Sequence, residues 1–280
     1  MNAYRVRRNI AKGIPYVVIT IGLLFALIPF IWIFSTSFKE KEEIGMKPLH
    51  YLPHQPTLRN YIDSWQRNPL GRWYLNTAIV SVSATVIAMC LAMLAGYGFS
   101  RFPIKGKNVM LVTILFSHMF PACLIVIPYF VWMSRLRLIN TYPGLIITYL
   151  SGALPFSIWM LKGFFDTIPR EMDQAAMIDG CNHVTAFFRV ILPLSAPGIS
   201  AATLYSFLAA WNNYLYSLIM VTRDSMMTLN VGITIFMSEA GVRWGEMNAV
   251  AVLISLPIIV AFLYFEKYMV AGMTAGAVKG

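Results

Sequence analysis

Charged residues are scarce in this sequence of 280 residues. Only 12% are Asp, Glu, Lys or Arg, against roughly 25% in an average soluble protein, whereas 58% are hydrophobic. Apolar runs of about 20 residues, the length at which a helix crosses the hydrocarbon core of a bilayer, recur along the chain. The composition therefore excludes an ordinary soluble domain and indicates a helical integral membrane protein.

Motifs that carry chemistry are also missing. The three cysteines, Cys90, Cys123 and Cys181, have no CxxC spacing, and the four histidines are scattered. Neither a disulfide framework nor a metal site is therefore predicted. The sequence contains no GxxxxGK[ST] phosphate-binding loop, no HExxH zinc motif and no GxSxG nucleophile elbow. We expect a non-catalytic chain that does not hydrolyse ATP itself.

Carboxylates are absent from the interiors of the apolar runs. A self-powered secondary transporter or channel, which is the alternative interpretation, usually places ionisable groups there for its coupling ion. The absence disfavours that alternative but leaves it open. The formal charge of +10 comes from Lys and Arg between the runs. That placement suits anionic lipid headgroups better than nucleic acid.

Six apolar segments are long enough to be spans, which predicts an all-α bundle of six transmembrane helices. The expected spans are residues 14–34, 74–99, 109–133, 144–165, 199–221 and 249–265. Pro121 and Pro128 should kink the third span and Pro155 the fourth, so these two spans are candidates to line a water-filled path. Residues 1–13 carry four basic side chains and no acid, which by the positive-inside rule places both termini in the cytoplasm.

The most informative stretch is the cytoplasmic loop between the fourth and fifth spans, residues 166–198. It predicts two short helices. Pro169 suits the first position of one helix, and Gly180 can adopt the left-handed conformation that ends it. Asn182 can cap the second helix, which Pro193 limits. A helix of about ten residues is too short to cross a bilayer, so we expect it to lie across the cytoplasmic face.

The first of these short helices is a candidate contact for a partner protein. Glu171 and Asp173 fall in its first turn, where they complement the helix dipole and can form ion pairs. Ala175 and Ala176 make one side small enough for a partner to approach closely. Local physics leaves a second interpretation open, a surface connector with no partner.

The run E-x-D-Q-A-A-x-x-D-G at residues 171–180, with I-L-P at residues 191–193, resembles the EAA loop of membrane subunits of binding-protein-dependent ABC importers. Other segments resemble the carbohydrate branch of that family, the MalG-type permeases of maltose-like importers. These segments are residues 119–122, 159–165, 244–246 and 272–280. The resemblance covers nearly the whole chain. It implies a type I, MetI-like permease domain over residues 14–267 and a cytoplasmic tail over residues 268–280.

The resemblance also implies a set of partners. The loop would be a coupling helix that docks in a cleft of a cytoplasmic ATPase, and two ATPase copies would bind ATP and magnesium. A second homologous permease subunit, an extracytoplasmic sugar-binding protein, membrane lipid and an oligosaccharide substrate complete the set, in a bacterial inner membrane. The implied coupling residues are Glu171, Asp173, Ala175, Ala176, Asp179, Gly180 and Pro193.

Three further groups of site residues are expected. In the family the tail reaches between the ATPase subunits, which here implies Thr274, Gly276 and Lys279. The loop before the last span inserts into the binding protein, which implies Arg223, Asp224, Glu239, Arg243 and Trp244, unless this is only a solvated loop. Aromatic and amide groups suit sugar hydroxyls. The substrate-path candidates are therefore Met119, Trp211, Asn212 and Asn213. Polar packing between helices is the competing interpretation. The sugar stays open between neutral oligosaccharides, acidic uronates and a polyol phosphate.

Overall fold

The computed structural model describes residues 2–238 and 241–277, without the side chains of residues 2–14 and 270–277. The chain divides into two compact units. The first unit comprises Met1–Pro69 and Ile235–Ser255, and the second comprises Leu70–Thr234 and Leu256–Gly280.

Four helices contain segments long and apolar enough to cross a membrane. They are α1 (Asn2–Ser37), α3 (Leu70–Arg101), α6 (Tyr142–Thr167) and α13 (Trp244–Ala277). Two further helix pairs reach that length when a bend is included, so the described residues hold up to six candidate spans by length and composition. The predicted all-α membrane fold is confirmed, and the first, second, fourth and sixth predicted spans each fall within one continuous helix.

The third predicted span is wrong as a single kinked helix. The chain forms α4 (Lys107–Met119) and α5 (Ala122–Arg135), which meet at an angle of 96°. Pro121 lies in the break, where it cannot donate a backbone hydrogen bond, and Phe120 before it is extended, as the residue preceding a proline prefers. Pro128, by contrast, is accommodated inside α5.

The fifth predicted span also differs from the expectation. α10 (Ala196–Trp211) ends ten residues before the predicted boundary at residue 221, and a short α11 (Leu215–Met220) follows. Asn213 lies between the two helices and its Oδ1 accepts a hydrogen bond from the Tyr216 N–H at 3.3 Å. Such local bonds from an asparagine compete with helix continuation. At its other end α10 is bent by 81° from residues 183–194.

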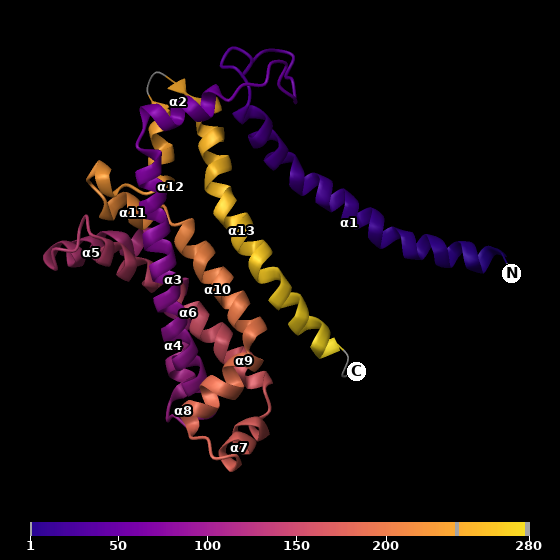
Figure 1. The fold of residues 1–280 in the computed structure, drawn as a ribbon, viewed down its shortest axis with the longest axis vertical. Helices are drawn as coiled ribbons and strands as arrows, with labels where there is room; N and C mark the ends of the chain where they lie inside the picture. Colours follow the sequence, from indigo (N-terminus) through magenta and orange to yellow (C-terminus); the bar gives the residue numbers. More distant parts are fainter. Residues whose placement is uncertain (1, 239–240, 278–280) are drawn as a thin grey trace. The chain divides into compact units, whose positions relative to one another are not determined.

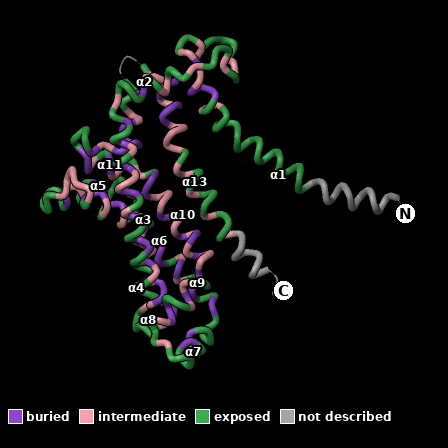
Figure 2. The backbone as a smooth tube through the Cα atoms, viewed as in Figure 1, coloured by how far each residue is buried: buried purple, intermediate pink, exposed green. Residues whose placement is uncertain are grey.

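The core of the second unit lies where α3, α6 and α10 pack side by side (Figure 1). Small residues permit this packing: Ala84, Ala88 and Ala92 recur every four residues on α3 and are fully buried. Gly96 continues the row against the backbone of α6 at Lys162. Figure 2 shows the buried positions following these three helices down to the turn that carries α7.

Shorter elements complete both units. In the second unit these are α7 (Arg170–Ile178), α8 (His183–Ala186), the π-helix η1 (Phe187–Ile191), α9 (Leu192–Leu194), η2 (Asp224–Met226) and α12 (Leu229–Gly232). The first unit holds α2 (Arg59–Arg67) and a hairpin of β1 (Met237–Ser238) and β2 (Gly241–Val242), in which Met237 pairs with Val242. The 3-10 helix η3 (Ile233–Phe236) leads into the hairpin.

Candidate coupling site

α7 forms where the sequence predicts the first short helix. Pro169 occupies the N-cap position, one residue earlier than expected, and the helix begins at Arg170. Glu171 and Asp173 fall in the first turn, as predicted. Their negative charge complements the unpaired N–H groups at this end.

Gly180 ends α7 in the predicted left-handed conformation, with φ of +87°. Its N–H donates to the Met177 carbonyl at 3.1 Å, and the Cys181 N–H donates to the Ala176 carbonyl at 2.9 Å. This pair of bonds is the Schellman motif, which satisfies carbonyl groups that a helix end leaves free. A residue with a Cβ would be strained at this φ.

The second short helix begins at the predicted cap. The Asn182 side chain accepts from the Thr185 N–H, and the Thr185 hydroxyl accepts from the Asn182 N–H, both at 2.8 Å. The helix continues through η1 and α9 to Leu194, one residue beyond Pro193, and the 81° bend into α10 follows. Pro193 therefore lies in the last turn before the bend, where it is exposed, and not on α7.

Asp173 faces the bundle and not the solvent, which corrects its assignment to a partner-facing surface. Its Oδ2 lies 2.8 Å from Nε of Arg101, and its Oδ1 accepts a hydrogen bond from the Tyr97 hydroxyl at 2.8 Å. The Arg101 and Asp173 side chains are only 8% and 9% exposed. The carboxylate therefore attaches α7 to the C-terminal end of α3.

A second set of polar contacts joins the ends of α3 and α6 to the start of α7. Arg101 also donates from Nη2 to the Ile168 carbonyl at 3.0 Å, and Arg170 donates to the Ser100 carbonyl at 3.2 Å. The Ser100 hydroxyl donates to Asp166 at 2.7 Å. The two arginine bonds use backbone carbonyl groups at helix ends that have no partner within their own helix. They fix the direction in which the chain leaves α6.

Apolar packing ties the rest of the loop to the same place. Phe187 in η1 is buried, and its ring centroid lies 4.7 Å from that of Tyr97 and 6.2 Å from that of Phe165. Ile191 and Leu161 belong to the same cluster and are fully buried. α7, η1 and the ends of α3 and α6 thus form one packed body.

The two alanines of the loop do not share a face. Ala176 is buried and Ala175 is exposed. Neighbouring residues on a helix point about 100° apart, so only one of them can face a partner while the other packs inward. The prediction that both alanines line one small side is wrong for Ala176.

An exposed face remains on the far side of α7 and the segment after it, and we call it the outer face. Its members are Glu171, Met172, Gln174, Ala175, Met177, Ile178, Asp179, Gly180, Val184 and Phe188. Ile178 is 85% exposed, Val184 63% and Phe188 55%. The sequence interpretation missed these apolar residues, although branched and aromatic side chains in a charged loop were a signal for a contact.

The tail residues and the predicted binding-protein contact are only partly described by the structure. Thr274 and Gly276 continue α13, but their side chains lie outside the described residues, as do Lys279 and Glu239. Arg223 and Asp224 belong to the second unit, whereas Arg243 and Trp244 belong to the first unit. The predicted binding-protein contact is therefore distributed over two units.

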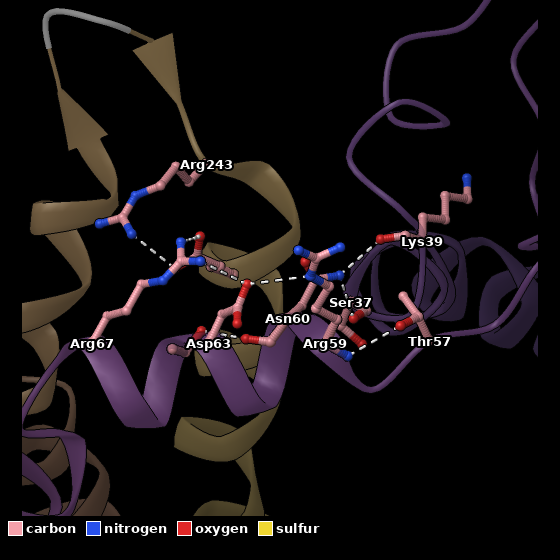
Figure 3. A network of polar contacts seen from close by, with 10 residues as sticks. Ser37, Lys39, Thr57, Arg59, Asn60, Asp63, Arg67 and Arg243 are labelled. Carbon is pink, nitrogen blue, oxygen red and sulfur yellow. Dashed lines mark hydrogen bonds and ion pairs between the residues drawn. The ribbon is translucent and has the colours of Figure 1, made fainter.

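In the first unit, α2 is attached to residues 35–39 and to the start of α13. The Asn60 side chain donates to the Ser37 carbonyl at 2.9 Å and to the Lys39 carbonyl at 2.8 Å (Figure 3). Glu246 is hydrogen-bonded to Arg243 at 2.8 Å and lies 3.7 Å from Arg67. These contacts hold α2 and the hairpin in one body.

A cavity of about 410 Å³ opens beside these contacts in the first unit. Acidic and basic side chains line it together with the half-exposed Trp244. The lining includes Glu40, Lys41, Glu42, Arg59, Asp63, Arg67, Arg243, Trp244 and Glu246.

The predicted substrate-path residues do not gather in one place. Trp211 is 2% exposed and its ring meets Tyr74 edge to face, with centroids 5.7 Å apart. The Asn213 side chain accepts a hydrogen bond from the Tyr216 N–H, Asn212 is exposed, and Met119 is exposed at the end of α4. Among the described residues no group of His, Cys, Asp or Glu side chains could hold a metal ion.

Comparisons with known proteins identify the family of this chain. Residues 88–274 match the family described as binding-protein-dependent transport system inner membrane component. The sulfoquinovosyl glycerol transport system permease protein SmoH of Agrobacterium fabrum is 34% identical over 96% of this chain and 94% of its own length. The trehalose/maltose transport system permease protein MalG of Thermococcus litoralis is 33% identical over 98% of this chain and 99% of its own length.

A solved structure has the same fold. It is a crystal structure of a bacterial ABC transporter involved in the import of the acidic polysaccharide alginate, with a TM-score of 0.78 and 23% identity over 93% of this chain and 96% of that one. The family match covers α7 and the contacts that fix it to α3 and α6. The chain therefore belongs to the inner membrane components of binding-protein-dependent transport systems, the multi-pass, non-catalytic permease subunits of ABC importers.

Proposed function

We propose that this chain transmits the motions of a cytoplasmic ATPase to a sugar pathway, and that the outer face of α7 is where the ATPase docks. The observation that carries the proposal is the buried contact of Asp173 with Arg101 and Tyr97. A helix can pass its motion to the bundle only if it is rigidly attached to the bundle, and this contact attaches α7 to α3. The opposite side of the same helix is exposed and carries the apolar side chains of Met172, Met177 and Ile178.

The composition of the outer face supports a protein as its partner. A single exposed apolar side chain is ordinary on a protein surface. Several together, such as Ile178, Val184 and Phe188, favour burial in a complementary cleft. Glu171 and Asp179 lie at the two ends of α7, where ion pairs with a basic cleft add orientation. Two copies of an ATPase, one on this chain and one on a second permease subunit, would complete the importer.

The substrate class follows from the relatives. SmoH, MalG of Thermococcus litoralis and the trehalose transport system permease protein SugB of Mycobacterium tuberculosis are all named for carbohydrates or glycosides. A sugar or oligosaccharide delivered by an extracytoplasmic binding protein is therefore the substrate proposed for this chain. In the same proposal both termini face the cytoplasm, which puts α7 on the ATPase side.

A substitution that strains the backbone at the end of α7 without a steric clash tests the proposal. Gly180 has φ of +87°, and a Cβ added there would have nothing within 4 Å, so Gly180→Val disturbs the backbone and not the packing. In the complete importer, reconstituted in liposomes with its ATPase and binding protein, this variant should lose ATP-driven uptake while the ATPase still hydrolyses ATP.

Gly106 provides the matched control. It also has positive φ, at +75°, and nothing within 4 Å of a Cβ, but it lies in the loop before α4. Gly106→Val carries the same backbone strain and should keep uptake close to that of the wild type. Equal loss in both variants, or normal uptake by Gly180→Val, would contradict the assignment of α7.

A further inference from the structure

Four aromatic rings from three helices meet beside the break between α4 and α5. Phe156 of α6 is at the centre: its ring centroid lies 4.5 Å from Tyr205 of α10, 5.9 Å from Trp159 of α6 and 6.1 Å from His118 of α4. We call these four residues the aromatic cluster. None of them belongs to the coupling contacts. His118, Phe156 and Trp159 lie in the two spans that the sequence predicts to line a path, and Tyr205 lies in the fifth predicted span.

The aromatic cluster carries polar groups inside a membrane-spanning region. The Tyr205 hydroxyl and Nε2 of His118 are 3.3 Å apart, and this contact is exposed. One further hydrogen-bonding position on each group is therefore open to a ligand. Rings that offer apolar faces and hydroxyl or imidazole groups at their edges match the two sides of a sugar ring, its C–H face and its hydroxyls.

A second observation points to a water-filled path at the same place. α4 ends at Met119, directly after His118, and α5 leaves at 96°. The last carbonyl groups of α4 and the first N–H groups of α5 have no partner within their helices. Within a membrane such backbone is tolerated only when it is buried in protein or lines a water-filled cavity. Met119 is 71% exposed and Phe120 52%, so the break is not buried within this chain.

The charge of the region restricts the ligand. Residues 108–134, 142–161 and 196–222 contain no Asp, Glu, Lys or Arg. An acidic sugar placed against the aromatic cluster would lose hydration of its carboxylate without gaining a cationic partner from these helices. An uncharged ring has no such cost.

We propose that the aromatic cluster is a sugar-binding site of this chain, and that it receives an uncharged pyranose or furanose ring of the transported glycan. Phe156 and Trp159 contact the C–H face, and His118 and Tyr205 hydrogen-bond the hydroxyls. The proposal rests on the proposed function, because it assumes that the chain lines a sugar pathway. It assigns the contact to this subunit and not only to its permease partner.

The test uses the complete importer in liposomes with its ATPase and binding protein. The probes are radiolabelled maltose, trehalose and diacetylchitobiose as neutral sugars and an alginate trisaccharide as an acidic one. The wild type should import at least one neutral probe in preference to the acidic probe. Import of none of them would contradict the proposed sugar importer itself, and import of the alginate trisaccharide alone would overturn the choice of an uncharged ring.

Two variants then test the site with the imported probe. Tyr205→Phe removes only a hydroxyl and should lower the maximal uptake rate about 5-fold to 10-fold, the effect of one hydrogen bond. Phe156→Leu should lower it by about 10-fold through lost ring contact. Because the binding protein captures the sugar first, the half-saturating concentration should stay unchanged, and ATP hydrolysed per sugar imported should rise.

The control is Phe25→Leu, a change of an exposed phenylalanine on α1 that the aromatic cluster does not include. It should leave the uptake rate and the ratio of ATP to sugar unchanged. Wild-type uptake by both cluster variants would overturn the site. Loss of the second permease subunit from either variant on purification would also overturn the site, because the rings would then form a contact between subunits. An equal fall in uptake and in ATPase activity would overturn it as well, because such a fall indicates a structural role.

Discussion

Arg101 at the end of α3 and Asp173 in the first turn of α7 form an ion pair of 2.8 Å that is almost completely buried. A buried pair does not by itself make a protein more stable, because both charges lose their hydration. It does fix geometry, because neither charge tolerates the loss of the other. We infer that this pair sets the angle of α7 against the bundle.

Removing one partner of this pair should be costly. Arg101→Leu leaves the Asp173 carboxylate buried without its cation, which destabilises the fold by about 3 to 5 kcal/mol. Tyr97→Phe removes one hydrogen bond to the same carboxylate and should cost only about 1 to 3 kcal/mol. Thermal unfolding of the purified complex, together with hydrogen exchange at the amides of α7, measures both effects.

Arg189 supplies the control for the ion pair, because it lies in η1 and is exposed. Arg189→Leu should leave both the unfolding temperature and the exchange of α7 close to the wild type. If Arg101→Leu behaved in the same way, the pair would have no role in positioning α7.

Ala175 and Ala176 allow the two faces of α7 to be separated. Ala176→Leu adds three carbon atoms to a packed position and should destabilise the fold by about 1 to 3 kcal/mol. Ala175→Leu adds them to the outer face, so stability should stay unchanged while the ATPase is lost on co-purification. The reverse pattern would mean that the faces of α7 are misassigned.

Gly198 permits α10 to lie close to α6. A Cβ at this position would overlap the ring of Phe164, so Gly198→Ala should destabilise the bundle by about 1 to 3 kcal/mol. Gly163 on α6 has nothing within 4 Å of a Cβ, and Gly163→Ala should be neutral or stabilise the helix by up to about 1 kcal/mol. Thermal unfolding in detergent compares the two, and equal stabilities would contradict the close approach.

The contacts of Glu246 in the first unit should differ in strength. Arg243 is hydrogen-bonded to Glu246 at 2.8 Å, and Arg243→Leu should cost about 1.5 to 3 kcal/mol because Glu246 is nearly buried. Arg67 is 56% exposed and 3.7 Å away, so Arg67→Leu should cost no more than about 1 kcal/mol. Unfolding measured at low and high salt should show that only the Arg67 effect is screened. A larger cost for Arg67→Leu would refute this ranking.

Local features of the coupling loop were predictable from the sequence because local interactions decide them. Gly180 ends a helix through its own conformational freedom, and Asn182 caps one with its own side chain. Asp173 and Ala176 were misplaced because burial depends on which side of α7 meets α3, and that contact joins residues more than 70 positions apart. A short helix with acids on several sides does not encode that choice.

For the membrane spans, too, the sequence predicted local features but not the contacts between helices. Apolar length was enough to place the helices that are continuous, such as α3 and α6. A proline at position 121 predicted a disturbance of the third span but not a 96° break. Whether a proline gives a kink or a break depends on whether neighbouring helices or water satisfy the freed backbone groups, and the local sequence does not encode this. The aromatic cluster went unpredicted for a related reason, since its rings come from three separate helices.

Ile178 provides the most direct measurement of the central claim, that the outer face of α7 docks on the ATPase. In a chain whose Cys90, Cys123 and Cys181 have been replaced by serine, Ile178→Cys and, as a control, Lys105→Cys each present one thiol to a maleimide reagent in inside-out vesicles. We expect Ile178→Cys to react freely when the permease subunits are alone and to be protected when the ATPase is bound, while Lys105→Cys reacts equally in both. Equal labelling of Ile178→Cys with and without the ATPase, in complexes that still import sugar, would contradict the account.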